Sequence, residues 1–136
     1  MPTDEELSAI YTSAKTIAVV GISADPSKDA HTVPEYLQYY GYKIVPVNPK
    51  GGEILGEKVY GSLDDVDIPV DVVDVFRPAE EAPGIARSAI KIGAKVLWMQ
   101  PGIISDEAAE IAIEAGLTVV MDTCIRTNHR RLGFGE

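Results

Sequence analysis

The chain is 136 residues long and carries a formal net charge of −9, from 12 lysines and arginines against 21 aspartates and glutamates. Its length fits one domain, 1–136, and its acidity opposes nonspecific binding to nucleic acid or to anionic lipid. No apolar run approaches the length of a membrane-spanning helix, the acidic N-terminus lacks the order of a secretory signal, and one cysteine cannot form an intramolecular disulfide. We therefore expect a cytoplasmic protein with no nucleic-acid and no membrane partner.

In chain order, the predicted elements alternate between helices and short strands. A helix near residues 4–14 comes first, and the strands that follow are rich in Val and Ile and mostly apolar on both faces, which is typical of buried parallel strands. We predict these strands at 16–22, 43–47, 70–76, 95–99 and 118–121. Apolar residues at helical spacing predict helices over about 33–40, from about 82 to Gly93, and from Ser105 to Gly116, with a further helix at the C-terminus.

The helix predicted over 33–40 has recognisable boundaries in the sequence. Thr32 and Glu35 match a capping box, and Pro34 is tolerated in a first helical turn. Gly41 can end the helix in the left-handed conformation. We therefore expect the loop after the first strand to extend as far as Thr32.

Right-handed crossovers between five parallel strands predict an α/β fold, a Rossmann-like doubly wound sheet with helices on both faces. The expected strand order is 3-2-1-4-5, counted along the chain. Under that order, the strand over 70–76 lies at an edge, where Asp71 and Asp74 would reach solvent or discourage pairing with another chain. We favour this structural interpretation of the two aspartates over a catalytic one.

Ligands of such sheets bind outside the carboxyl ends of the strands, where the strand order reverses. The loop after the first strand begins at Gly21 and leads into a helix whose free N–H groups suit an anion such as a pyrophosphate. Ser23, Ser27 and Lys28 could add hydroxyl donors and a positive charge to that loop. The loop is therefore the first candidate for a phosphate-binding segment.

The chain lacks the usual fingerprint of a dinucleotide site. That fingerprint would read G-x-G-x-x-G after the first strand, with an acidic residue about 20 positions further on for the ribose hydroxyls. Here Gly21 stands alone, and the second strand ends in the uncharged Asn48. An amide followed by Lys50 tolerates a phosphorylated ribose, which a carboxylate would repel.

Several segments in order resemble one known family, the stand-alone CoA-binding proteins whose domain is similar to the CoA-binding domain of succinyl-CoA synthetase. The matching segments are VVGIS, YLQYYGYKIVPVNPKGGEILGEKVYGSL, VDVFRP, GAKVLWMQPGI and GLTVVMDTCIRTNHRRL, which together cover roughly residues 10–132. The resemblance implies a Rossmann-like fold that holds coenzyme A, with the first loop at the phosphates and the IVPVNP segment near the adenosine.

Carried over by position, the resemblance also implies roles for individual residues. The residues expected at the phosphates are Gly21, Ser23 and Lys28, those lining the nucleotide pocket are Val47, Asn48 and Pro49, and those flanking the ligand are Phe76, Arg77 and Gln100. The predicted CoA site also includes Ile22, Ser27, Lys50 and Cys124. One departure is Lys28, beside Asp29, where members of the family often carry arginine: lysine keeps the charge but loses the bidentate geometry.

Three further residues invite a catalytic interpretation. Cys124, just past the last strand, could form a mixed disulfide with the thiol of CoA or act as a nucleophile, although such a cysteine is more often a small buried hydrophobe. His31 could donate to a phosphate or simply face solvent, and His129 fits a C-terminal helix lying over the sheet. No H-E-x-x-H motif or cysteine pair indicates a metal.

These observations favour a non-catalytic module, a carrier or a sensor, that binds CoA or an acyl-CoA. The synthetase needs a second domain that bears a phosphorylated histidine, and 136 residues leave no room for it, so ligase activity by this chain alone is not expected. The fold would also permit an NAD(P)-binding oxidoreductase, and a protein-interaction domain with a vestigial nucleotide pocket is a third hypothesis. The sequence leaves open whether the chain forms a homodimer or binds an enzyme partner, and which acyl group, if any, the ligand carries.

Overall fold

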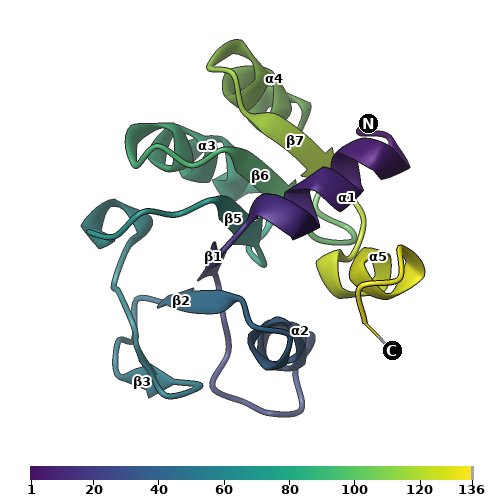
Figure 1. Ribbon diagram of the computed structural model, residues 1–136. Coiled ribbons are helices and arrows are strands. Elements are labelled where there is room, and N and C mark those ends of the chain that lie inside the picture. Colours follow the sequence, from purple (N-terminus) through teal and green to yellow (C-terminus); the bar gives the residue numbers. More distant parts are fainter. Residues whose placement is uncertain (136) are drawn as a thin grey trace.

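The computed structural model describes residues 1–135 and contains a five-stranded sheet flanked by helices (Figure 1). The strands of this sheet are β1 (Thr16–Val20), β2 (Lys43–Val47), β5 (Val72–Val75), β6 (Val96–Met99) and β7 (Thr118–Met121). The helices are α1 (Asp4–Ser13), α2 (Asp29–Tyr39), α3 (Ala82–Lys91), α4 (Asp106–Glu114) and α5 (Ile125–Arg131). The connections contain a hairpin of β3 (Glu53–Ile54) and β4 (Glu57–Lys58), and two 3-10 helices, η1 (Leu63–Asp65) and η2 (Ala79–Glu81). All neighbouring strands of the large sheet are parallel, which confirms the predicted α/β fold.

Helices cover both faces of the sheet and bury two apolar layers. Figure 1 shows α3 and α4 together on one face, with α1, α2 and α5 on the other. The layer under α3 and α4 is built with small side chains such as Ala86 and Ala112, which let the helices approach the strands closely. The opposite layer contains the larger Leu37 and Trp98, both fully buried. No helix among residues 1–135 has both the length and the apolar character needed to cross a bilayer.

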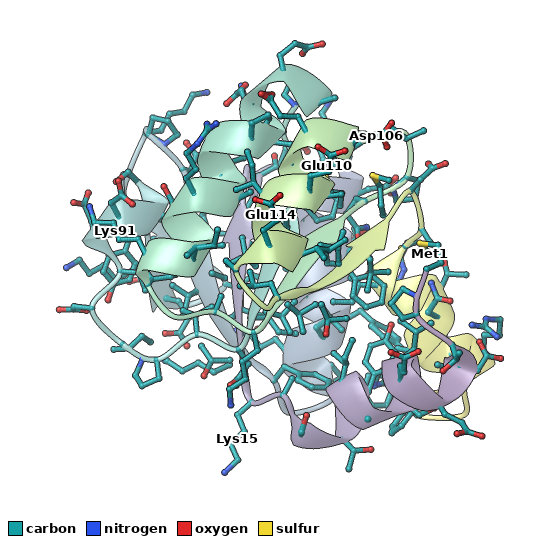
Figure 2. All side chains as sticks on the ribbon, turned by 90° about the horizontal axis from the view of Figure 1, so that it is seen from above. Met1, Lys15, Lys91, Asp106, Glu110 and Glu114 are labelled. Atoms are coloured by element: carbon teal, nitrogen blue, oxygen red, sulfur yellow. The ribbon has the colours of Figure 1, made fainter. Side chains whose placement is uncertain are left out.

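The outer side of α4 is acidic. Asp106, Glu110 and Glu114 follow one another at intervals of four residues and point away from the sheet (Figure 2). All three are exposed, and they account for part of the strong negative charge of the chain. This acidic surface lies on the side of α4 that faces away from the apolar layer.

The strand order corrects one prediction. Counted along the chain, the main strands lie in the order 2-1-3-4-5 rather than 3-2-1-4-5, because β5 pairs with β1 on one side and with β6 on the other. All four residues of β5 are buried, as a central strand requires. The edge strands are β2 and β7, and Pro46 in β2 has no N–H to donate to a further strand.

The two aspartates of this segment therefore have environments different from those predicted. The Asp71 carboxylate accepts hydrogen bonds from the backbone N–H groups of Lys15 at 2.8 Å and Thr16 at 3.0 Å, which fixes the start of β1. Asp74 lies inside the sheet with 0% of its surface exposed, and neither carboxyl oxygen has a hydrogen-bond partner among the described residues. The prediction that Asp74 reaches solvent is wrong because β5 is central.

The start of α2 also differs from prediction. The helix begins at Asp29 after the N-cap residue Lys28, so Thr32 lies within it and does not cap it. Pro34 lies inside the helix and, having no N–H, leaves the Ala30 carbonyl without its helical donor. That carbonyl instead accepts a hydrogen bond from the Ser23 N–H at 3.1 Å, so the proline indirectly fastens the first loop to the helix.

Other helix boundaries follow the sequence signals closely. Ser105 caps α4, with its hydroxyl accepting from the Ala108 N–H at 3.1 Å, which confirms the predicted start. At the N-terminus, Thr3 and Glu6 form a complete capping box on α1. The result is a rigid scaffold that presents the carboxyl ends of the strands at one edge.

Candidate functional site

The main cavity, about 1130 Å³, lies at the carboxyl ends of β1 and β2 and reaches the first turns of α3. Its walls come from the loop after β1, the turn after β2, the segment before η1, and the start of α3. The lining residues are Val20 to Asp25, Val47 to Ile54, Gly61 to Leu63, Arg77, Glu80, Glu81, Gly84, Ile85 and Ser88. This is the position at which open α/β sheets bind their ligands.

Most of the predicted site residues meet at this cavity, and the others lie elsewhere. Those on its wall are Gly21, Ile22, Ser23, Val47, Asn48, Pro49, Lys50 and Arg77. Those on the wall of a second, smaller cavity are Phe76, Gln100 and Cys124. Ser27 and Lys28 line neither cavity.

Gly21 allows the first loop to approach the end of β5. Its φ of +91° lies in the region that favours glycine, and its N–H donates to the Val47 carbonyl at 3.0 Å. A Cβ at this position would lie 2.8 Å from the Arg77 side chain and 2.9 Å from the Phe76 carbonyl oxygen. The backbone itself therefore requires glycine here, whether or not a ligand is bound.

Gly21→Ala should consequently destabilise the fold. The positive φ strains any residue with a side chain, and the Phe76 carbonyl can move only by distorting β5, so we expect the free energy of unfolding to fall by about 1–3 kcal/mol. Urea denaturation followed by circular dichroism measures the change. Gly93→Ala, which has a similar φ of +80° but open space around the added Cβ, is the matched control and should lose less. Equal losses of unfolding free energy in the two variants would show that the contact of position 21 with Phe76 and Arg77 is unimportant.

Asn48 joins the two loops that line the main cavity. Its side-chain amide donates to the Ile22 carbonyl at 2.8 Å, and its side-chain oxygen accepts from the Lys50 N–H at 2.9 Å. The backbone N–H of Asn48 donates to the Tyr60 carbonyl at 2.9 Å. Asn48 thus holds the turn after β2 in place and brings Lys50 to the wall.

The charges on the wall are mixed. Arg77 binds Glu81 with a shortest distance of 2.6 Å, and this hydrogen bond raises the pKa of Arg77 and lowers the pKa of Glu81. The arginine is therefore already partnered. The carboxylate of Asp25 accepts from the Ser27 N–H and hydroxyl at 2.9 and 2.7 Å, and these bonds lower the pKa of Asp25. Lys50 is the lining cation that carries no described ion pair.

The second cavity, about 350 Å³, lies at the carboxyl ends of β5 and β6 next to the starts of α2 and α5. The residues that line it are Asp29, Val33, Phe76, Gln100, Pro101, Ile103, Cys124, Arg126 and Thr127. Phe76 and Arg77 are neighbours in sequence and line different cavities, so the two cavities lie on either side of the end of β5. Arg126 also donates to the Thr32 hydroxyl at 3.3 Å, which joins α5 to α2.

Gln100 holds Cys124 in the second cavity. Its side-chain oxygen accepts from the Ile125 N–H at 3.0 Å, and its amide nitrogen lies 3.6 Å from the Cys124 sulfur as a donor. Burial pushes the pKa of Cys124 upward, but hydrogen bonds from Thr127, Gln100 and Arg126 together lower it below the ordinary value of a thiol. The thiolate therefore forms more readily at this position than on an ordinary thiol.

Both histidines have structural partners. The His31 ring nitrogen Nδ1 lies 2.7 Å from the Ser23 carbonyl oxygen, which ties the first loop to α2. His129 is buried, bonds the Tyr36 hydroxyl at 2.7 Å, and is surrounded by aromatic rings that include Tyr11 and Phe134; burial lowers its pKa. Within residues 1–135, no group of His, Cys, Asp and Glu side chains could hold a metal ion.

Sequence reasoning missed part of both walls. It did not foresee the hairpin of β3 and β4 or the contribution of α3, which brings Gly84 and Ser88 to the main cavity. The glycines that follow β2, Gly51 and Gly52, were a signal, because both have positive φ and form an open turn at the ligand edge. Arg126 and Thr127 in the second cavity were also missed.

The parallel sheet, its two helical layers and the cavity at the carboxyl ends of the strands define a Rossmann-like α/β protein. The family model described as CoA binding domain matches residues 15–130. The chain therefore belongs to the CoA binding domain family.

The chain is also similar to individual proteins and solved structures. The chain is 42% identical over 128 residues to the uncharacterised protein YneT of Bacillus subtilis, covering 94% of this chain and 95% of that one. It is 37% identical over 97 residues to the alpha subunit of the ADP-forming acetate–CoA ligase I of Pyrococcus furiosus, covering 67% of this chain but only 21% of the subunit. Among solved structures, Prb, a redesigned PH1109 protein, superposes with a TM-score of 0.96 at 43% identity, covering 100% of this chain and 95% of that one.

Proposed function

We propose that this chain binds coenzyme A, or an acyl-CoA, in the main cavity and acts as a non-catalytic binding module, a carrier or a sensor. The observation that carries the proposal is the position of the cavity: it lies at the carboxyl ends of β1 and β2, within the residues that the CoA binding domain model matches. A volume of about 1130 Å³ exceeds the usual size of a small-ligand pocket and suits a long, branched ligand.

The chemistry of the wall supports a nucleotide at one end of this cavity. The loop after β1 offers backbone groups and the Ser23 hydroxyl, and Lys50 offers a positive charge that no described carboxylate neutralises. Carboxylates also line the cavity, at Asp25, Glu53 and Glu80. Phosphates would therefore be placed near Lys50 and the start of the first loop, at Gly21 to Ser23, rather than beside these carboxylates.

Isothermal titration of the purified protein with CoA, acetyl-CoA, NAD and NADP tests the proposal. We expect heat with the CoA ligands and little with the nicotinamide dinucleotides, because the first loop lacks the three glycines of a dinucleotide site. Heat with NAD or NADP alone would favour an oxidoreductase instead. No heat with any of the four would favour a protein-interaction domain and would contradict the proposal.

A pair of lysine variants locates the phosphates. Lys50→Ala removes a charge from the wall and should weaken CoA binding about ten-fold, the effect of one charge-assisted hydrogen bond. Lys28→Ala is the matched control, since Lys28 lies outside the wall, and should weaken binding less. Titration of both variants with CoA measures the difference. A larger effect at Lys28 would place the phosphates at the start of α2 instead.

A further inference from the structure

The second cavity contains a pair of chemically unusual groups. Cys124 lines it and accepts hydrogen bonds that lower its pKa, and Asp74 in β5 is fully buried without a hydrogen-bond partner. Asp74 lies in β5 and Phe76 directly follows that strand, two residues further on, so their side chains point to the same face of the sheet, and Phe76 lines the cavity. Cys124 packs against the apolar layer on that same face, which also contains Val72 and Phe76.

Asp74 calls for an explanation because a buried polar group without a partner is rare and destabilising. Burial, and then any negative charge on Cys124, raise the pKa of Asp74 well above that of an ordinary carboxyl. The neutral acid can remain beside a thiolate, whereas an ionised carboxylate would oppose it. The arrangement therefore suits a sulfur that carries negative charge during a reaction.

The position of the second cavity relative to the main one indicates which ligand reaches Cys124. The two cavities lie on either side of the end of β5, where Gly21 has no side chain, Arg77 lines the main cavity and Phe76 lines the second. Coenzyme A is a nucleotide with a long arm that ends in a thiol. With its nucleotide in the main cavity, the arm can cross this ridge and bring its sulfur into the second cavity.

We propose that Cys124 is a thiol–disulfide exchange site for CoA-containing disulfides, so that the protein captures CoA covalently. The proposal rests on the proposed function. In the exchange, the Cys124 thiolate attacks the CoA sulfur of a disulfide R–S–S–CoA. The new bond joins the Cys124 sulfur to the CoA sulfur, the original S–S bond breaks, and RS⁻ leaves with the electron pair and takes a proton from water. Cys124 is oxidised, the RS group is reduced, and the disulfide reagent is the oxidant.

The test measures how fast the intact protein gains mass with two probes, CoA disulfide and oxidised glutathione. Binding of the nucleotide raises the local concentration of the first probe, so we expect it to react roughly 100-fold faster. Cys124→Ser should form no adduct with either probe. Equal rates with the two probes, or an adduct on Cys124→Ser, would overturn the proposal.

Two bulky substitutions show whether the main cavity guides the reaction. Gly84→Trp fills that cavity and should reduce the rate with CoA disulfide to that with oxidised glutathione. Glu110→Trp, on the outer side of α4, should keep the preference (Figure 2). If Gly84→Trp still reacts faster with CoA disulfide than with oxidised glutathione, binding in the main cavity does not guide the reaction and the proposal is overturned.

Titration of Cys124→Ser with reduced CoA separates this proposal from the proposed function. Heat from this variant, together with no adduct on the unmodified protein, would overturn the covalent capture and leave CoA binding standing. If neither the variant nor the unmodified protein gives heat, the covalent capture and the proposed CoA binding are both contradicted.

Discussion

Gly84→Trp should abolish CoA binding without disturbing the fold. Gly84 lies in the first turn of α3 on the wall of the main cavity, and an added Cβ would find no atom within 4 Å. The indole can therefore occupy the cavity without displacing the backbone, and replacing a helical glycine favours the helix. Isothermal titration with CoA should give no measurable heat, while circular dichroism should stay unchanged.

The control for this prediction is Glu110→Trp, an equally bulky change on an exposed helical position remote from both cavities. It should bind CoA as the unmodified protein does. Unchanged affinity in Gly84→Trp would show that CoA does not use the main cavity.

Asp74→Val should stabilise the protein. The carboxyl is fully buried without a partner in the central strand, between Val73 and Val75, and an apolar side chain of similar size removes the desolvation penalty. We expect the free energy of unfolding at neutral pH to rise by about 1–3 kcal/mol. Asp71→Val is the matched control and should destabilise, because the N–H groups of Lys15 and Thr16 would lose their acceptor.

The gain from Asp74→Val should depend on pH in a defined direction. Burial raises the pKa of Asp74 in the folded state, so its contribution to stability is fully present below about pH 4, the unfolded pKa, and is lost as pH rises toward the folded pKa. The stability difference between variant and unmodified protein should therefore grow as pH rises above about 4. Urea denaturation across this range measures it, and contributions from groups such as His129 cancel in the difference. A gap that shrinks with rising pH would contradict a buried, neutral Asp74.

The fold class followed from apolar strands and amphipathic helices, but the strand order depends on a less obvious signal in β2. Pro46 cannot donate to a neighbouring strand, and this favours an edge position for β2. The connection after β2 contains a hairpin and a 3-10 helix rather than a long helix, and β5 pairs beyond β1. Because β5 is central, Asp74 became a buried acid that local sequence could not reveal.

The candidate site was predictable where it depends on strand ends and not where it depends on distant elements. Gly21 and Asn48 directly follow strands, so topology alone brought them to one edge. Lys28 was expected there as a cation of the first loop and from the family resemblance, whereas it is the N-cap residue of α2 and lines neither cavity. Gly84 reaches the cavity only through the packing of α3, which no local pattern specifies.

Binding of CoA in the main cavity can be tested by following the backbone amide signals of isotopically labelled protein as CoA is added. We expect shifts at the main cavity, at Gly21, Ser23, Gly51 and Gly84, extending to Cys124 in the second cavity. Shifts confined to the surface of α4, or none at saturating CoA, would contradict binding in the main cavity.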